Sequence, residues 1–410
     1  MKSTKITRRQ FLKTSLTTTV SIPVLSSLTS QLAFAATGNA PHTVINVFLR
    51  GGMDSLSALV PHADPQYYAL RPDIAIPAEG LIKLSSEFSL HKAMEPLHEF
   101  YQRGELAFVA ASGLGPNSSS RSHFNAQRRM EAGTDNHTQA DGWVGRYVDS
   151  TRTVNDASFR AVSHKRIPKS LSGYDPAISF SRLSELSVQA NDLMSDERAV
   201  EMLKGLYQQV NHPELTLQSS NAFSAIDEAA NNALGTLAKP TSYGNSKLGA
   251  ALHQIAELMI SDVGLEAASL SMGGWDLHRE MGTWDAGSMR DQLSDLSTAL
   301  SAFYNEISGL QEKVTIVVMS EFGRRVTQND SGGTDHGKGG MMMVLGKGIN
   351  GGKVHGEWPG LNSLDENDLP IVTDYRQVLT EMLAVRMGRN DLVSSVFPDY
   401  LGGSYLGVMG

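Results

Sequence analysis

Short apolar segments that end in glycine-rich polar turns recur along this chain, and they constrain its fold more than any other feature. Each segment has the length and composition of a buried strand. They cover residues 44–49, 106–111, 265–272, 314–319 and 341–345. Between them, apolar side chains recur at helical spacing, most clearly from Leu293 to Leu310. A last helix is expected over 374–387, ending at Gly388.

Strands that alternate with helices predict an α/β/α sandwich, in which a mostly parallel sheet is covered by helices on both faces. The stretch 151–243 differs, because it is rich in Ser, Asn and Ala and reads as helix with loops. We interpret it as a helical insertion or cap on a single α/β domain spanning 36–410.

The first 35 residues have the pattern of a twin-arginine export signal. Arg8 and Arg9 precede a weakly apolar stretch, and Ala33-Phe34-Ala35 offers a signal peptidase its small residues. We therefore expect cleavage before Ala36, handling by the twin-arginine translocation machinery, and a periplasmic or otherwise exported protein. Ser and Thr interrupt the stretch too often for a strong membrane-spanning helix, and no permanent membrane span is expected later in the chain.

Charge and cysteine content exclude several classes of function. Five of the 35 basic residues lie in the signal, which leaves 30 basic against 43 acidic residues, a net charge of −13. An acidic protein of this kind is not expected to bind nucleic acid, which requires a basic surface. The chain has no Cys, so disulfides, thiolate metal sites and a thiol nucleophile are excluded.

Acidic residues and histidines follow the carboxyl ends of the predicted strands. In a doubly wound sheet, ligands bind at these strand ends. Asp54 follows the first strand, Asp276 and His278 the third, and Glu321 the fourth, while His336 stands in a glycine-rich loop. Asp54 could equally cap the next helix. In an extended segment, Asp276 and His278 would point the same way and meet one ion.

Carboxylate and imidazole side chains together suit a divalent metal ion. Zn and Mn accept this mixture, and Ca or Mg would be favoured if oxygen ligands dominate. A metal there could polarise an ester oxygen or lower the pKa of a bound water. The alternative is a set of turns with a purely structural role. Arg324 and Arg325 would form a solvated salt bridge, or one of them would hold an anionic oxygen pair.

Five motifs in the chain resemble the marks of a large bacterial family. They are Arg50-Gly-Gly-Met-Asp54-Ser, Arg121-Ser-His-Phe124, Gly273-Gly-Trp-Asp276-Leu-His278, Ser320-Glu-Phe-Gly-Arg-Arg325 and Gly333-Thr-Asp-His-Gly337. Members of this family are exported by the twin-arginine route, have no assigned function and are grouped with the alkaline phosphatase and sulfatase superfamily. The resemblance covers residues 44–397.

The superfamily resemblance implies a metal site at the strand ends with Asp54, Asp276, His278, Glu321 and His336 as ligands. Phe322 stands where the superfamily pattern has a His, so one ligand of a two-metal centre is missing. The segment 122–133 resembles the nucleophile helix, which places Ser122 or His123 at its head; Ser55 is a lesser candidate. The absence of Cys excludes a cysteine-derived formylglycine.

These expectations lead to two hypotheses for the function. The first is an exported metal-dependent hydrolase of phosphate or sulfate esters. In it Ser122 or a metal-bound water attacks, and Arg121, Arg324 or Arg325 holds the anionic group. The second is a periplasmic binding or assembly protein that retains the fold without the chemistry, for which Phe322 is the main support. A redox enzyme is disfavoured, because no Gly-x-Gly-x-x-Gly motif follows the first strand.

Overall fold

The computed structural model describes residues 42–116, 120–152, 155–174, 177–188 and 195–410. The predicted signal, residues 1–35, lies outside the described residues. Among those described, no helix is both long and apolar enough to cross a lipid bilayer.

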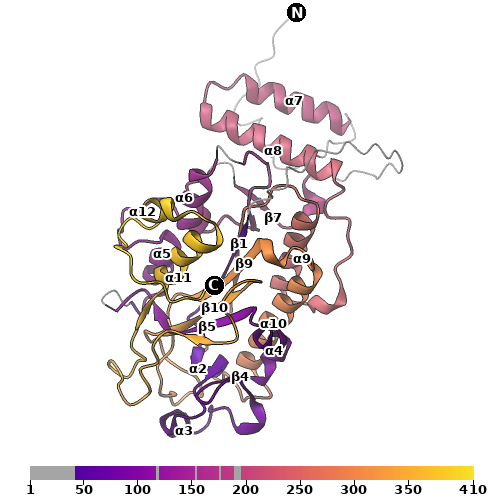
Figure 1. Ribbon diagram of the computed structural model, residues 1–410. Coiled ribbons are helices and arrows are strands. Elements are labelled where there is room, and N and C mark those ends of the chain that lie inside the picture. Colours follow the sequence, from indigo (N-terminus) through magenta and orange to yellow (C-terminus); the bar gives the residue numbers. More distant parts are fainter. Residues whose placement is uncertain (1–41, 117–119, 153–154, 175–176, 189–194) are drawn as a thin grey trace, which may run out of the picture.

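Within the described residues, one nine-stranded sheet forms the centre of the molecule (Figure 1). Its strands, in spatial order, are β11 (Val354–His355), β5 (Leu106–Gly113), β10 (Gly340–Leu345), β9 (Val314–Ser320), β1 (Thr43–Leu49), β8 (Ala267–Met272), β6 (Ala161–His164) and β7 (Ile178–Phe180), with β12 (Thr373–Asp374) also paired to β5. A separate small sheet has the order β2 (Leu59–Val60), β4 (Ser89–His91) and β3 (Leu81–Lys83).

The central strands run parallel, as predicted. β1 pairs in parallel with β8 and β9, with Val44 opposite both Ala267 and Thr315. All seven residues of β1 are buried, because the strand is covered on both faces. β10 runs antiparallel to both β5 and β9, a direction that the sequence did not indicate. Since two reversals restore the direction, β5 still ends at the same edge of the sheet as β1, β8 and β9.

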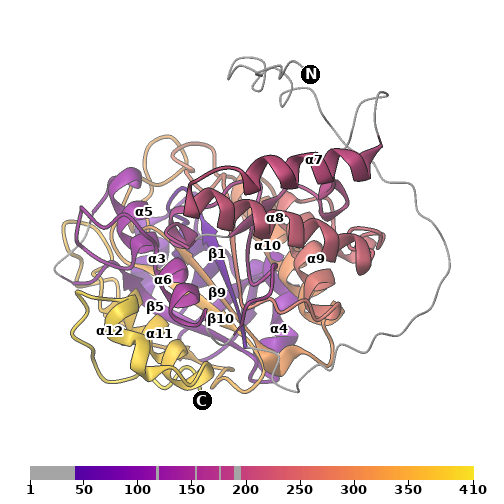
Figure 2. The ribbon, with the colours of Figure 1, turned by 90° about the horizontal axis from the view of Figure 1, so that it is seen from above.

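Helices cover both faces of the sheet, which confirms the predicted α/β class with a mostly parallel sheet. One face carries α4 (Glu95–Gln102), α9 (Lys247–Ile260) and α10 (Ser288–Glu306). The other face carries α5 (His123–Ala132), α6 (Trp143–Ser150), α11 (Tyr375–Glu381) and α12 (Val393–Val396). Figure 2 shows these two groups of helices on opposite sides of β1, β9 and β10.

Alternation along the strands explains the two layers of core. In β1, Ile45, Val47 and Leu49 pack with the α9 and α10 layer, whereas Val44 and Phe48 pack with the α5 and α6 layer. A smaller cluster lies under the short helices α2 (Ser55–Ala58) and α3 (Pro65–Leu70).

The stretch 151–243 is divided between sheet and helices. β6 and β7 belong to the main sheet, whereas α7 (Asp196–Gln208) and α8 (Pro213–Asn231) form a pair of contacting helices beyond β7 (Figure 1). β6 and β7 were not predicted from the sequence, because they are short and carry polar residues such as Ser163 and Ser179.

Candidate functional site

The loops that follow four strands meet at one edge of the sheet. Asp276 and His278 lie in the loop after β8, and Glu321 follows β9 directly. His336 lies in the connection from β9 to β10, and His123 is the first residue of α5, which comes after β5. The four strands β1, β5, β8 and β9 share a direction, so the loops that follow them lie at the same edge of the sheet.

Two glycines let the loop after β1 approach its neighbours closely. Gly51 has φ +126°, and a Cβ there would lie 2.4 Å from the backbone nitrogen of Asp276. Gly52 has φ +66°, and a Cβ there would lie 2.3 Å from the ring of Phe322. Any side chain at these positions would push apart the loops that carry the site.

Three imidazole rings point their Nε2 atoms at one carboxylate oxygen, Oδ1 of Asp276. The Nε2–Oδ1 distances are 3.4 Å for His123, 3.0 Å for His278 and 3.3 Å for His336. The Nε2 atoms of His278 and His336 are 2.9 Å apart. His123, Asp276 and His336 each offer a ligand atom within 4.8 Å of the other two, and His278 adjoins this group. We call these four residues the histidine–aspartate cluster.

The other nitrogen of each ring faces a hydrogen-bond acceptor. Nδ1 of His123 lies 2.8 Å from the Glu321 carboxylate, and Nδ1 of His278 lies 3.0 Å from the Asp335 carboxylate. Nδ1 of His336 lies 2.8 Å from the backbone oxygen of Arg121. An acceptor at Nδ1 assigns the hydrogen to that nitrogen, so each Nε2 directs a lone pair into the cluster.

This arrangement fits a metal ion. Carboxylates or carbonyls that fix the tautomer of ligating histidines are the usual surroundings of such sites. Ligands about 2.1 Å from a tetrahedral ion are about 3.4 Å apart, close to the separations of 2.9–3.4 Å found in the cluster. The Nε2 atom of His123 is also buried without a hydrogen-bond partner. Together these residues can hold a metal ion.

Electrostatics keep the ligand atoms in the states that a cation requires. Burial opposes ionisation of Asp276, but a 2.5 Å hydrogen bond from Arg324, together with the charge of Arg324, lowers its pKa to about 2. Burial, with the nearby charge of Arg324, lowers the pKa of His336 below its ordinary value, despite opposing hydrogen bonds. Asp276 is therefore ionised and His336 neutral at neutral pH.

Glu321 lies behind His123 rather than inside the cluster. It is fully buried, and one carboxylate oxygen accepts hydrogen bonds from Gly51 N, Gln127 and His123, each at 2.8 Å. Burial would raise its pKa, but these hydrogen bonds lower it, so the group stays ionised. Glu321 therefore orients His123 and does not have the ligand role that was predicted for it.

Asp54 lies outside the cluster as well. Its two oxygens accept from Arg71, at 2.6 and 3.0 Å, and Ser57 donates to one of them at 2.9 Å. Arg71 is completely buried, so this bidentate pair is a structural element of the loop after β1. The predicted ligand role of Asp54 is corrected for this reason.

Arg324 holds the loops together and is not free to bind an anion. Its guanidinium donates to Asp276 and to the backbone oxygens of Gly51, Gly52, Thr334 and Trp275. The side chain is 1% exposed. The prediction that Arg324 holds an anionic group is therefore wrong, and its guanidinium positions Asp276 instead. Arg121 remains partly exposed, but its guanidinium is paired with Asp368 and Glu366.

Ser122 caps the amino end of α5, where its exposed hydroxyl makes no capping hydrogen bond. It precedes His123 directly, and the helix N-terminus there favours a negatively charged partner. Ser55, in contrast, is buried in α2. Phe322 packs against the rings of both His123 and His336, with centroids 4.9 Å from each. It forms a wall of the site at the position where a further ligand was expected.

Sequence reasoning gave no role to Asp335, Gln127 or Arg71. Asp335 was detectable, because it stands next to His336 in the same glycine-rich motif. Arg71 and Gln127 carried no local signal.

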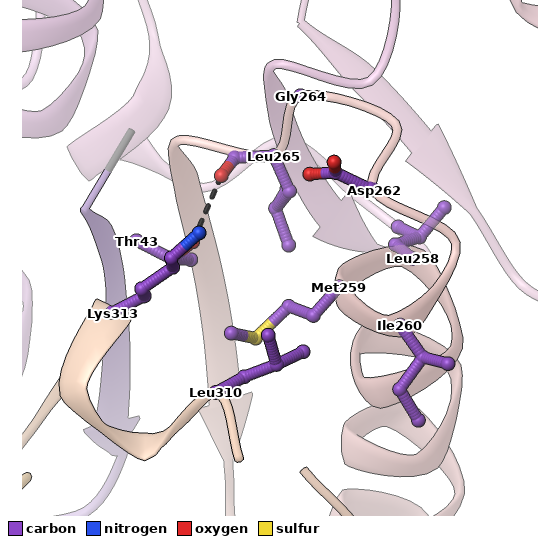
Figure 3. Close-up of a pocket in the computed structure, with 9 residues that line it drawn as sticks. All are labelled: Thr43, Leu258, Met259, Ile260, Asp262, Gly264, Leu265, Leu310 and Lys313. Carbon is purple, nitrogen blue, oxygen red and sulfur yellow. Dashed lines mark hydrogen bonds between the residues drawn. The ribbon is translucent and has the colours of Figure 1, made fainter. Parts of the chain in front are cut away.

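A pocket of about 270 Å³ lies at the opposite, amino edge of the sheet, and it contains none of these residues. Figure 3 shows it between the start of β1, at Thr43, and the end of α9. Leu258, Met259, Leu265 and Leu310 make its wall mainly apolar. Among the described residues that line it, Asp262 is the only carboxylate and none is a histidine.

A family model described as "Protein of unknown function (DUF1501)" matches residues 41–385. The chain belongs to the DUF1501 family. This confirms the family expected from the motifs and leaves its activity open. A search of curated protein sequences returned no match.

Solved structures similar to this DUF1501 chain include members of the alkaline phosphatase and sulfatase superfamily. The PsFucS1 sulfatase from Pseudoalteromonas sp. is 13% identical over 92% of this chain and 74% of its own, with a TM-score of 0.40. The zinc complex of the C-terminal periplasmic domain of EcEptC from Escherichia coli is 7% identical, over 76% and 74%, with a TM-score of 0.38. Alkaline phosphatase from the Antarctic bacterium TAB5 is 10% identical, over 87% and 98%, with a TM-score of 0.28. At these values the likeness supports no statement about activity.

Proposed function

We propose that this chain is an exported, metal-dependent hydrolase of phosphate or sulfate esters. The single observation that carries the proposal is the convergence of three imidazole Nε2 atoms on Oδ1 of Asp276. Export rests on the arginine pair and the small residues before Ala36.

The donor set favours Zn or Mn over Ca or Mg. Three imidazole nitrogens and one carboxylate oxygen match the ligands of Zn and Mn, whereas Ca and Mg prefer oxygen throughout. When bound, such an ion supplies a positive charge that polarises the ester oxygen and lowers the pKa of water. Glu321, Asp335 and the Arg121 carbonyl keep the three rings in the required orientation.

Ser122 is the proposed nucleophile, because its hydroxyl is exposed at the amino end of α5 beside His123. Attack by its oxygen on phosphorus or sulfur would transfer the phosphoryl or sulfuryl group to the serine and release the alcohol of the ester. Water would then hydrolyse the serine ester and release phosphate or sulfate. Attack by water without a covalent step is the alternative. Ser122→Ala separates the two, because it abolishes turnover only if the serine attacks.

Activity assays on the purified chain test the proposal. Protein loaded with Zn or Mn is incubated with p-nitrophenyl phosphate, bis-p-nitrophenyl phosphate and p-nitrocatechol sulfate. We expect turnover of at least one ester, and a loss of more than about 100-fold in Asp276→Asn and His336→Ala. His137→Ala, at an exposed histidine outside the cluster, is the control that should keep full activity. Equal rates in all four proteins would overturn the proposal.

A binding or assembly protein is the second candidate, and Phe322 favours it. This ring occupies the place of an expected ligand and contacts two rings of the cluster. This candidate predicts that the cluster still binds a metal ion but that no ester on the panel is turned over. It also predicts that a stable partner is recovered with the purified chain.

A further inference from the structure

A tight acidic turn packs beside the histidine–aspartate cluster. The backbones of Asp365 and Asp368 exchange hydrogen bonds of 2.9 and 3.0 Å, so Glu366 and Asn367 form a two-residue turn. Both turn residues have positive φ, +53° and +70°, the geometry of a type I′ hairpin turn. Asp368 also forms a backbone bridge with Arg325, next to the bridge between Arg324 and His336. The turn is therefore attached to the segment that carries the cluster.

Two cationic side chains hold the carboxylate of Glu366. Nη2 of Arg121 lies 3.2 Å from Oε2 of Glu366, and Nζ of Lys338 lies 3.4 Å from the same atom. Arg121 also binds Asp368 at 2.5 Å, and Lys338 binds Asp365 at 2.6 Å. With Arg325, 4.0 Å from Asp368, the group contains three cations and three carboxylates, so its formal charge is balanced.

Both cations belong to segments that build the cluster. The backbone oxygen of Arg121 is the hydrogen-bond acceptor for Nδ1 of His336, and Lys338 follows His336 by two residues. Glu366 therefore contacts two cations whose backbone segments also contribute to the cluster.

The three carboxylates differ in how tightly they are held. Asp368 is fully buried, whereas the side chain of Glu366 is 69% exposed. An exposed ion pair contributes little to stability. Glu366 is thus the member of the group that is easiest to displace. Its loss leaves one net positive charge between Arg121 and Lys338.

Two atoms of the group are not satisfied by the protein. Oδ1 of Asp368 and Nε of Arg325 are buried and face each other at 4.0 Å, too far for a hydrogen bond, and neither has another hydrogen-bond partner among the described residues. Buried polar atoms without partners are costly, so this border of the site does not complete its own hydrogen bonding.

We propose that Arg121 and Lys338 form an anion-binding subsite beside the metal ligands, and that Glu366 is its resident anion, displaced by a tetrahedral oxyanion such as phosphate or sulfate. A phosphate or sulfate group offers several acceptor oxygens in place of one carboxylate, which suits an arginine and a lysine together. The subsite would hold the charged part of an ester, and in this respect the inference rests on the proposed hydrolase function.

Phosphate binding to metal-free protein tests the subsite without requiring turnover. Isothermal titration with inorganic phosphate, and separately with sulfate, is performed in the presence of EDTA on the wild type, Glu366→Gln and Glu214→Gln. Glu214 is exposed on α8 and provides the same change of net charge away from the site. We expect phosphate to bind up to about fivefold more tightly to Glu366→Gln, as removal of one competing exposed ion pair implies, and unchanged binding to Glu214→Gln.

A second substitution identifies the cations. Lys338→Met in the Glu366→Gln background should remove the gain in affinity, and a thermal unfolding curve verifies that this double variant is folded. Equal phosphate affinity in Glu366→Gln and Glu214→Gln would overturn the proposal, as would a gain that survives Lys338→Met. Because metal and turnover play no part, a failed hydrolase proposal and a failed subsite give different results.

Discussion

The two edges of the central sheet are built from the same strands but differ in chemistry. At the carboxyl edge, three imidazole rings face a carboxylate and are oriented by acceptors at their outer nitrogens. At the amino edge, His42 bonds the hydroxyl of Thr315 and lies near the charge of Arg386, beside a mainly apolar pocket. An imidazole is suited to bind a metal when an acceptor fixes its Nδ1 hydrogen and other ligand atoms face its Nε2. Here the loops after the strands provide those groups, so strand direction determines the edge at which they gather.

The largest expected effect is on metal affinity at the carboxyl edge. His336→Ala removes one nitrogen ligand, and we expect zinc to bind about 1,000-fold more weakly, equivalent to about 4 kcal/mol. His42→Ala, which removes an imidazole from the amino edge, should leave the affinity unchanged. Competition with a chelating zinc indicator measures both variants. Equal losses in the two would contradict the contrast between the edges.

The next effect concerns a buried ion pair near the amino edge, where Arg160 contacts Glu266 at 2.7 Å and both side chains are almost fully buried. Glu266→Gln leaves the guanidinium without its counter-charge, so the free energy of unfolding should fall by about 3 kcal/mol. Urea denaturation measures this change. Zinc affinity should stay at its wild-type value, and a drop in it would show that the two edges are coupled.

The pH dependence of stability tests the state of His42. Burial, and then the charge of Arg386, lower its pKa to about 4. Because the folded-state pKa lies below the unfolded value of about 6.5, the unfolded chain binds more protons as the pH falls. This group should therefore cost about 2 kcal/mol of stability between pH 6.5 and 4, after a discount for partial exposure, and nothing above pH 7.

Urea denaturation at pH 7 and at pH 4.5, on metal-free wild type and His42→Gln, isolates that contribution. The variant should lose less stability on acidification than the wild type does. Identical losses would mean that His42 does not titrate in this range.

The smallest expected effect sharpens the role of Glu321. Glu321→Gln keeps an acceptor near His123 but removes the negative charge behind the ring, so zinc affinity should fall about tenfold. The same indicator competition measures it. Glu306→Gln is the matched control, since Glu306 also contacts a histidine, His253, outside the cluster. Loss of affinity in the control would exclude a specific role for Glu321.

Strand positions could be predicted well where the apolar run was uninterrupted. β1 and β9 match the expected segments within one residue, because both are buried along their whole length or nearly so. An apolar run carries no direction, however, and β10 looks the same in sequence whether it runs parallel or antiparallel. The strands β6 and β7, at one end of the sheet, have four and three residues and were not distinguishable from loop.

The cluster was predictable in part for the same reason. Asp276, His278 and His336 follow strands in glycine-rich turns, and strand order alone brings such turns together. Asp54 stands in an equivalent place, but Arg71, which follows 17 residues later in the chain, pairs with it. Glu321 orients His123 because it faces Nδ1 of the ring, while Nε2 of the same ring faces Asp276. Spacing along the chain does not determine which ring nitrogen faces which carboxylate, so neither role could be predicted from the sequence.

The register of β1 has a consequence for how the protein folds. Its partners β8 and β9 begin more than 220 residues later, at Ala267 and Val314. At about 5–20 residues per second of synthesis, this largely apolar strand waits some tens of seconds for its neighbours. Contacts of such long range slow folding and leave a strand that is prone to aggregate. We therefore expect newly made chains to depend on chaperones until residue 320 has emerged from the ribosome.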